Sequence, residues 1–345
     1  MKLLRTSAFL AAGVSAVLLT GCGSVNDGAA STGASGDAKA SDMTMVTVVK
    51  LKGIAWFDRM DEGVQEYGKR TGIDTRTEGG DDVSAEKQIK IIQDLIAQQP
   101  TAITVVPNSP EAVANVLAQA KSKGIITVAH EATGIENVDV DIEAFDNAVY
   151  GEKIMTSLGA CTEGKGEYVQ FVGGLTAKTH MEWVGAAYDH QKSNFPDMKR
   201  VEDPIESTDN EGAAYQKAKE ILAKHPNIKA FQGSAGNDVP GIARAVEEAG
   251  KADEICVMGT SIPSAANKYL ATGGIDKIFF WDPALAGEAQ LEIARILATG
   301  GKIDVGTDLG IEGYNSLKKL DGYDNVFLGD ASIEADAESA KQYDF

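Results

Sequence analysis

Short apolar runs alternate with helix-forming segments along most of the chain, and this alternation limits the fold more than any other feature. Residues 45–51 (MVTVVKL) form the first run, in which β-branched residues follow one another. A strand that is covered on both faces shows such a continuous run, so we expect a buried strand here. Residues 61–70 follow, with Val64 and Tyr67 at helical spacing, and Gly72 ends the helix. Strand, loop and helix in this order are typical of a parallel α/β sheet.

The same unit recurs through the rest of the chain. The runs that we expect to form further strands lie at residues 73–77, 102–106, 125–129, 167–172, 199–205, 228–232, 255–259 and 275–281, and most of them are followed directly by a helical pattern. A long amphipathic helix is predicted at 284–299. Single open sheets of more than ten strands are rare, so two lobes are expected instead of one.

The N-terminal residues have the pattern of an export signal. Residues 1–5 are positively charged, residues 9–19 are apolar but too few to span a bilayer, and Leu19-Thr20-Gly21-Cys22 resembles a bacterial lipobox. We therefore predict a lipoprotein signal peptide at residues 1–21 and a lipidated Cys22. Residues 22–44, which are rich in Gly, Ser, Ala and Asp, would form a disordered tether. In the alternative, Cys22 is an ordinary residue near the cleavage site of a soluble exported protein.

Charge and cysteine content narrow the function further. The chain has 32 Lys and Arg against 51 Asp and Glu, a net charge of −19, and such a surface repels nucleic acid and anionic lipid. We therefore expect no nucleic-acid partner and no membrane contact beyond the lipid. Cys161 and Cys256 are the remaining cysteines. Export permits a bridge between them, but we expect two isolated structural cysteines.

Polar and aromatic residues gather after the predicted strands. Lys50, Trp56 and Phe57 follow the first strand, His130-Glu131 follows 125–129, and Trp281-Asp282 follows 275–281. Ligands of open parallel sheets lie at the carboxyl ends of the strands. A sugar presents hydroxyl groups at its edge and C–H groups on its faces, so polar side chains and flat rings together suit it.

Several segments resemble one family of proteins. They are Lys50-Leu51 before a glycine and paired aromatic residues, the segment 174–184, the turn 259–263, Trp281-Asp282 before a helix, and the terminal Tyr343-Asp344-Phe345. In these segments the chain resembles the type I periplasmic binding proteins of ABC sugar importers, in the branch of the autoinducer-2 and rhamnose binding proteins. The resemblance implies two Rossmann-like lobes with parallel sheets, joined by three crossovers near residues 144, 282 and 312. The N-terminal lobe would comprise 45–144 plus 283–312, and the C-terminal lobe 145–282 plus 313–345.

The resemblance also implies a binding site. Lys50 matches the family's ligand-binding lysine, whereas His130 stands where autoinducer-2 binders have an aspartate, and Thr179-His180 where they have Asp-Gln. Their Pro-Asp-Ala turn is replaced by residues 234–236, followed by Asn237 and Asp238. These departures argue against autoinducer-2 as the ligand, but a polar pocket that fits a polyol is still expected. The predicted ligand-binding residues are Lys50, Trp56, Phe57, His130, Glu131, Thr179, His180, Ser234, Gly236, Asn237, Asp238, Trp281 and Asp282.

Some of these residues also have structural alternatives. Lys50 could pair with Asp282, Asp238 could cap a helix, and Trp56 and Phe57 could pack between the lobes. Trp183 lies at an apolar helical position, which favours the core. Each of these alternatives predicts a specific side-chain contact in the folded protein.

The function predicted from these features is that of a solute-binding lipoprotein of an ABC importer. It would be exported and anchored to the cell membrane, monomeric, without cofactor or metal, and not an enzyme; its partners would be a small neutral sugar, polyol or related furanose and the permease. A ligand-sensing receptor with the same fold is the alternative. A third hypothesis is an enzyme that uses His130, Glu131 and His180 as zinc ligands or as an acid/base pair. The sequence, however, lacks the His-x-x-x-His, Gly-x-Ser-x-Gly and Walker patterns of common catalytic sites.

Overall fold

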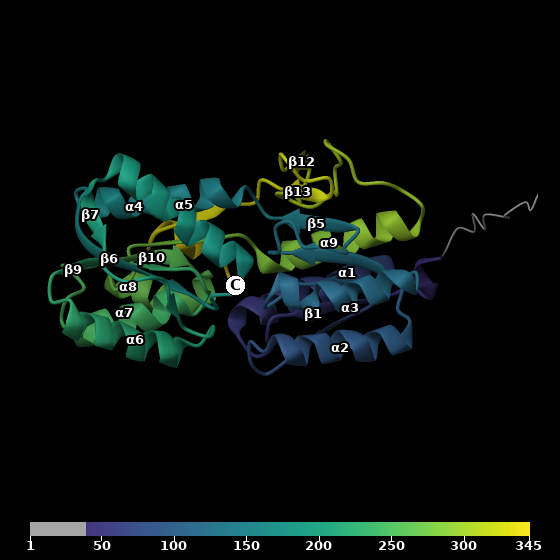
Figure 1. Ribbon diagram of the computed structural model, residues 1–345, viewed down its shortest axis with the longest axis horizontal. Coiled ribbons are helices and arrows are strands. Elements are labelled where there is room, and N and C mark those ends of the chain that lie inside the picture. The colour runs from purple at the N-terminus through teal and green to yellow at the C-terminus, as the bar shows by residue number, and fades with distance from the viewer. Residues whose placement is uncertain (1–38) are drawn as a thin grey trace, which may run out of the picture. The chain divides into compact units, whose positions relative to one another are not determined.

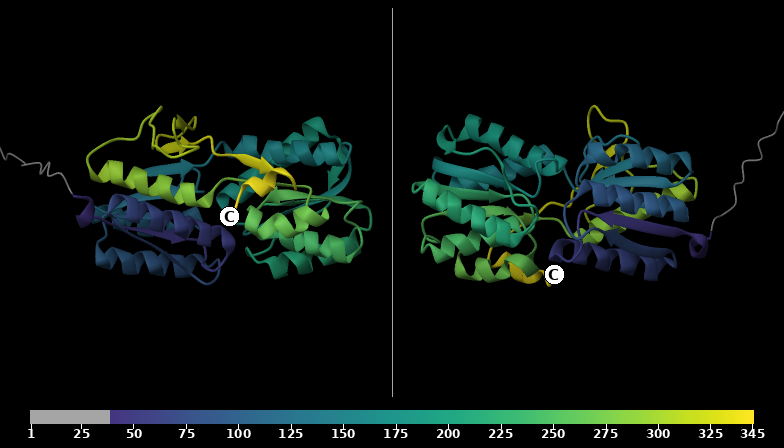
Figure 2. Two further views of the ribbon diagram at one scale, coloured as in Figure 1. Left: turned by 180° about the vertical axis from the view of Figure 1, so that it is seen from behind. Right: turned by 60° about the horizontal axis from the view of Figure 1, so that its bottom comes forward.

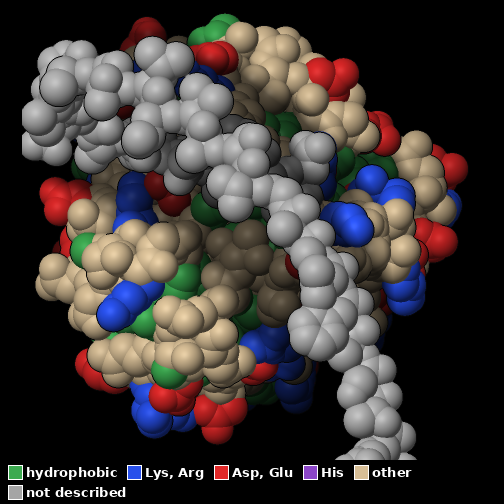
Figure 3. All heavy atoms as spheres, turned by 90° about the vertical axis from the view of Figure 1, so that its right-hand side faces the viewer, with side chains coloured by type: hydrophobic (Ala, Val, Ile, Leu, Met, Phe, Trp, Pro, Cys, Tyr) green, Lys and Arg blue, Asp and Glu red, His purple; other side chains and the backbone are tan. Residues whose placement is uncertain are grey.

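The computed structural model describes residues 39–345, which form two lobes of parallel-dominated sheet and helix (Figure 1). The predicted signal peptide, Cys22 and most of the predicted tether lie outside the described residues, so these remain predictions. Within 39–345 the helices are too short or too polar to cross a membrane. Acidic and basic side chains are interspersed over the described residues visible in Figure 3.

The first lobe contains a seven-stranded sheet in the order β12-β13-β5-β4-β3-β1-β2, parallel except for β12. Alternate residues of β1 point to opposite faces: Met45 and Val49 pack toward α1 and α9, and Val46 and Val48 toward α2 and α3. Both faces are therefore covered, as the continuous apolar run predicts. The elements are β1 (Thr44–Val49), α1 (Ala55–Thr71), β2 (Asp74–Gly79), α2 (Ala85–Gln98), β3 (Ala102–Val105), α3 (Pro110–Ser122), β4 (Ile126–His130), β5 (Val140–Glu143), α9 (Pro283–Ala298), β12 (Lys318–Lys319) and β13 (Val326–Leu328).

The second lobe has the sheet order β14-β11-β10-β9-β6-β7, with β8 pairing beside β6. Helices α4 and α5 pack together, as do α6 and α7. Residues 201–204 separate β7 from β8, where the sequence predicts one strand, and they include Pro204, which cannot donate to a sheet ladder. The elements are α4 (Asn147–Cys161), β6 (Lys165–Val172), α5 (Lys178–Asn194), β7 (Asp197–Arg200), β8 (Ile205–Glu206), α6 (Glu211–Lys224), β9 (Ile228–Gly233), α7 (Asp238–Glu248), β10 (Cys256–Thr260), α8 (Pro263–Thr272), β11 (Lys277–Phe280) and β14 (Ile333–Ala335).

Three crossings join the lobes, after β5, before α9 and after β13. The third crossing lies beyond Leu328, so the expectation of a crossing near residue 312 is wrong. The reason is that β13 pairs in parallel with β5, with Leu328 opposite Glu143. This pairing keeps residues 313–328 in the first lobe. Figure 2 shows from behind how the yellow C-terminal segment then passes to the second lobe, where β14 pairs with β11.

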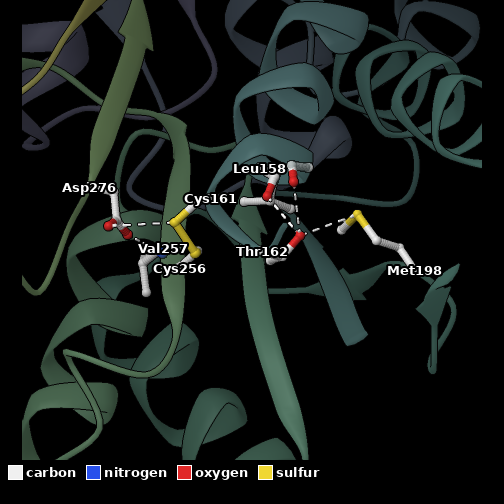
Figure 4. Close-up of a disulfide and its surroundings, with 8 residues drawn as sticks. Leu158, Cys161, Thr162, Met198, Cys256, Val257 and Asp276 are labelled. Atoms are coloured by element: carbon white, nitrogen blue, oxygen red, sulfur yellow. Dashed lines mark hydrogen bonds between the residues drawn. A yellow bond between two sulfur atoms is a disulfide. The ribbon is translucent and has the colours of Figure 1, made fainter. Parts of the chain in front are cut away.

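Cys161 and Cys256 form a disulfide, with an S–S distance of 2.03 Å (Figure 4). The expectation of two isolated cysteines is therefore wrong. Cys161 ends α4 and Cys256 begins β10, and the two elements pack together although the cysteines are 95 residues apart in sequence. Because both sulfur atoms are bonded to each other, the neighbouring Asp276 has no thiolate with which to share a metal ion.

Candidate functional site

The carboxyl ends of strands from both lobes meet at a small cavity of about 20 Å³. Trp56 and Phe57 reach this cavity from the first turn of α1, which begins at Ala55, earlier than the sequence predicts. The lining residues are Lys50, Ile54, Trp56, Phe57 and Glu131 from the first lobe, and His180, Trp183, Asp209, Ser234, Gly236, Thr260 and Trp281 from the second lobe and its crossing.

A buried ion pair forms the charged part of the cavity wall. Lys50 Nζ lies 2.5 Å from Glu131 Oε2, and both side chains are almost fully buried. Glu131 follows β4 in the left-handed backbone region, with φ +55°, which is uncommon for a residue other than glycine. Lys50 therefore pairs with Glu131 instead of Asp282. The ammonium group keeps two further N–H donors for a ligand.

His180 presents a neutral imidazole with a defined donor. Its Nδ1 accepts a hydrogen bond from Gly173 N at 3.1 Å, so the proton is on Nε2. Burial lowers the pKa of His180 well below its usual range, and nearby Lys50 lowers it further. The ring is thus an uncharged N–H donor at the cavity.

Aromatic rings supply flat apolar surface. Trp56 and Trp281 meet edge to face, with ring centroids 4.6 Å apart, although they come from different parts of the chain. Trp183 lines the cavity as well, and its Nε1 donates to Asn147 Oδ1 at 2.7 Å. Trp183 therefore belongs to the core, as predicted, and also to the cavity wall. Such rings suit the C–H faces of a sugar.

Asp209 lines the cavity, although it is not among the ligand-binding residues predicted from the sequence. It lies between β8 and α6, is buried, and has φ +54°. Burial raises the pKa of Asp209 to about 6, while Lys50 opposes this rise. The signal available in the sequence is Thr208-Asp209-Asn210, a polar group between a strand and a helix. Ile54 and Thr260 are also missed, and Thr260 Oγ1 lies 3.0 Å from the Tyr150 hydroxyl.

His130 and Thr179 lie outside the cavity wall, contrary to expectation. Nδ1 of His130 donates to Ile142 O at 2.6 Å, and its ring meets the ring of Trp281 edge to face, with the centroids 5.8 Å apart. Thr179 is buried in the first turn of α5. Residues 39–345 contain no group of three potential metal ligands that includes His130 or His180, so no ligand set in this part of the chain supports the zinc hypothesis.

Asn237, Asp238 and Asp282 also lie outside the cavity wall and instead hold the backbone around it. Asn237 Nδ2 donates to Asp209 O at 3.0 Å, and Asp238 Oδ2 accepts from the backbone N–H groups of the 234–235 turn. Asp282 caps α9 and accepts two hydrogen bonds from Arg59, at 2.9 and 2.7 Å. The protein therefore already supplies hydrogen bonds to both oxygens of Asp282 and to one oxygen of Asp238.

Comparison with known proteins gives a consistent result. Residues 45–302 match the family described as periplasmic binding protein domain. The D-allose-binding periplasmic protein of Escherichia coli (strain K12) is 24% identical over 284 residues, covering 75% of this chain and 85% of that protein. The D-apiose import binding protein of Paraburkholderia graminis is 28% identical over 239 residues, covering 67% of this chain and 74% of that protein.

Two solved structures have the same fold. LsrB from Clostridium saccharobutylicum in complex with AI-2 has a TM-score of 0.81 at 21% identity, covering 88% of this chain and 100% of that chain. An ABC transporter solute-binding protein from Clostridium phytofermentas with bound L-rhamnose has a TM-score of 0.79 at 20% identity, covering 87% and 99%.

Proposed function

The chain belongs to the periplasmic binding protein family, and from this premise we propose that it captures a small neutral sugar or polyol and delivers it to an ABC permease. The observation that supports this best is the cavity, in which Lys50 and His180 offer N–H donors beside the edge-to-face pair of Trp56 and Trp281. Donors at the edge of a flat apolar surface match the alternating polar and apolar sides of a sugar ring. The relatives named above are binding proteins, which supports a binding function over catalysis.

Capture would proceed by closure of the lobes. Hydrogen bonds within residues 39–345 now join them: Thr176 Oγ1 donates to Asn108 O at 3.2 Å, Thr133 Oγ1 donates to Glu182 Oε2 at 2.8 Å, and Asn147 Nδ2 donates to Thr133 Oγ1 at 3.0 Å. A ligand that contacts both lobes stabilises the form in which these bonds are made, and so shifts the population toward it. The closed form would then be the one that the permease recognises.

We also propose that the protein is a monomer and that Cys22 is lipidated and anchors it to the membrane. The support for the anchor is the lipobox-like Leu19-Thr20-Gly21-Cys22 after an apolar segment. Cells that express the chain should incorporate an alkyne-labelled fatty acid into it, and Cys22→Ser should abolish this labelling. Labelling that persists in Cys22→Ser would remove the anchor from the proposal.

Thermal melts against L-rhamnose, D-allose, D-xylose, D-arabinose, sugar alcohols and autoinducer-2 test the binding function. A ligand at a hundredfold excess over its Kd adds about 2.7 kcal/mol to stability. For a protein of this size the midpoint should rise by roughly 4 °C. Lys50→Gln and His180→Ala should remove the shift, whereas Lys52→Gln, at an exposed lysine nearby, should keep it. Absence of any shift across the panel would contradict the proposed ligand class.

A further inference from the structure

Asp209 is a buried residue whose carboxylate accepts no hydrogen bond from residues 39–345. The residue is only 6% exposed, and within residues 39–345 no donor reaches its carboxylate oxygens, although Asn237 holds its backbone oxygen. A Cβ at Gly173 would lie 2.9 Å from Asp209 Oδ2, so the glycine leaves room for the carboxylate. A buried carboxylate without donors is unfavourable, and hydroxyl groups of a ligand would supply the donors that are missing.

The charges around the cavity are unbalanced. Lys50 is the cation among the described lining residues, and Glu131 already pairs with it. His180 is neutral because burial lowers its pKa. Asp209, whose pKa is about 6, is ionised at pH 7.5 and adds a second negative charge. The lining therefore has a net charge of −1 before a ligand enters.

We propose that Asp209 is the residue that selects an uncharged ligand, by accepting hydrogen bonds from two hydroxyl groups and repelling anionic sugars. This inference rests on the proposed sugar-binding function and specifies its ligand class. A uronate, aldonate or sugar phosphate would bring a like charge into a desolvated site whose ammonium group is already paired. Neutral pentoses, hexoses and polyols bring hydroxyl donors instead.

Isothermal titration of the purified protein with matched sugar pairs tests this selection. The pairs are D-xylose with D-xylonate, D-arabinose with D-arabinonate, and D-galactose with D-galacturonate. The protein should bind at least one neutral member, and its anionic counterpart at least a hundredfold more weakly. Asp209→Asn should weaken binding of the neutral sugar by about tenfold to a hundredfold, since hydrogen bonds to a charged group are stronger than those to an amide. It should also reduce discrimination against the anion to about tenfold or less.

Asp209→Asn is a clean substitution because asparagine keeps the shape of the side chain and tolerates the left-handed backbone. A structural carboxylate would lower the melting temperature of the ligand-free protein when it is replaced, whereas a residue reserved for ligand should leave that temperature unchanged or higher. Asp203→Asn, at a fully exposed aspartate of the same lobe, is the matched control and should change neither property.

Two results would overturn the selection role while the sugar-binding function stands. They are an unchanged affinity of Asp209→Asn for a neutral sugar that the unmodified protein binds, and equal binding of both members of a pair by the unmodified protein. If no sugar binds the unmodified protein, the proposed function fails and this inference fails with it.

Discussion

Loss of the Cys161–Cys256 disulfide should lower stability by an amount that follows from the length of the loop it closes. The cysteines are 95 residues apart. The chain-entropy relation gives about 4.7 kcal/mol for a loop of that length at 25 °C. The entropy of unfolding is about 2.1 cal/mol/K per residue, so a folded part of roughly 300 residues should lose about 7 °C in Tm.

Circular dichroism melts with and without a reducing agent measure this loss, and Cys161 is exposed to the reagent. The double variant Cys161→Ser/Cys256→Ser should melt at the temperature of the reduced protein and should not respond to the reducing agent. In a Cys22→Ser background, the chain unfolded in guanidinium without reductant should contain no free thiol. Two free thiols, or a Tm change below 2 °C on reduction, would refute the reasoning.

Two further predictions concern stability. Gly259→Ala should lower the free energy of unfolding by more than about 3 kcal/mol, or abolish soluble expression, because a Cβ there would lie 2.0 Å from Gly233 O. The control is Gly185→Ala, where the space is open, and chemical denaturation should show it to be neutral or slightly stabilising. Burial raises the pKa of Asp238 to about 7, so the stability that its protonated form contributes is present below about pH 4 and lost as pH rises through 7. The free energy of unfolding of Asp238→Asn, relative to that of the unmodified protein, should therefore rise by on the order of 3 kcal/mol from pH 5 to pH 8. A difference in Tm between the two proteins that does not change with pH would contradict this.

The sequence predicts most of the fold because its elements obey local rules. The predicted helix at 284–299 is α9 (Pro283–Ala298), and Asp282 caps it. The apolar run at 102–106 contains β3 (Ala102–Val105). In contrast, β12, β13 and β14 have two or three residues each and acquire their role only by pairing with distant strands. No periodicity can develop over so few residues, so the sequence does not show where the third crossing lies.

The site is less predictable than the fold for a related reason. Lys50 and Trp281 follow long, clear strands, so their place at the carboxyl ends follows from the topology. Which neighbouring residue faces the ligand depends on tertiary contacts. Nδ1 of His130 donates a hydrogen bond to Ile142 O, whereas Asp209 lines the cavity with its backbone in a left-handed conformation. The hydrogen bond of His130 has no local sequence signal, and the same holds for the disulfide.

The pairing of β13 with β5 also constrains the order in which the protein can fold. The lobe that is synthesised first cannot be completed first, because β13 and α9 follow the α4–β11 segment of the second lobe in the chain. Until residue 328 is available, β5 remains an unpaired edge strand, which is a template for pairing with another chain. Contacts so distant in sequence also slow folding. Substitutions between α9 and β13 could therefore cause aggregation during biosynthesis while leaving the finished protein nearly as stable as before.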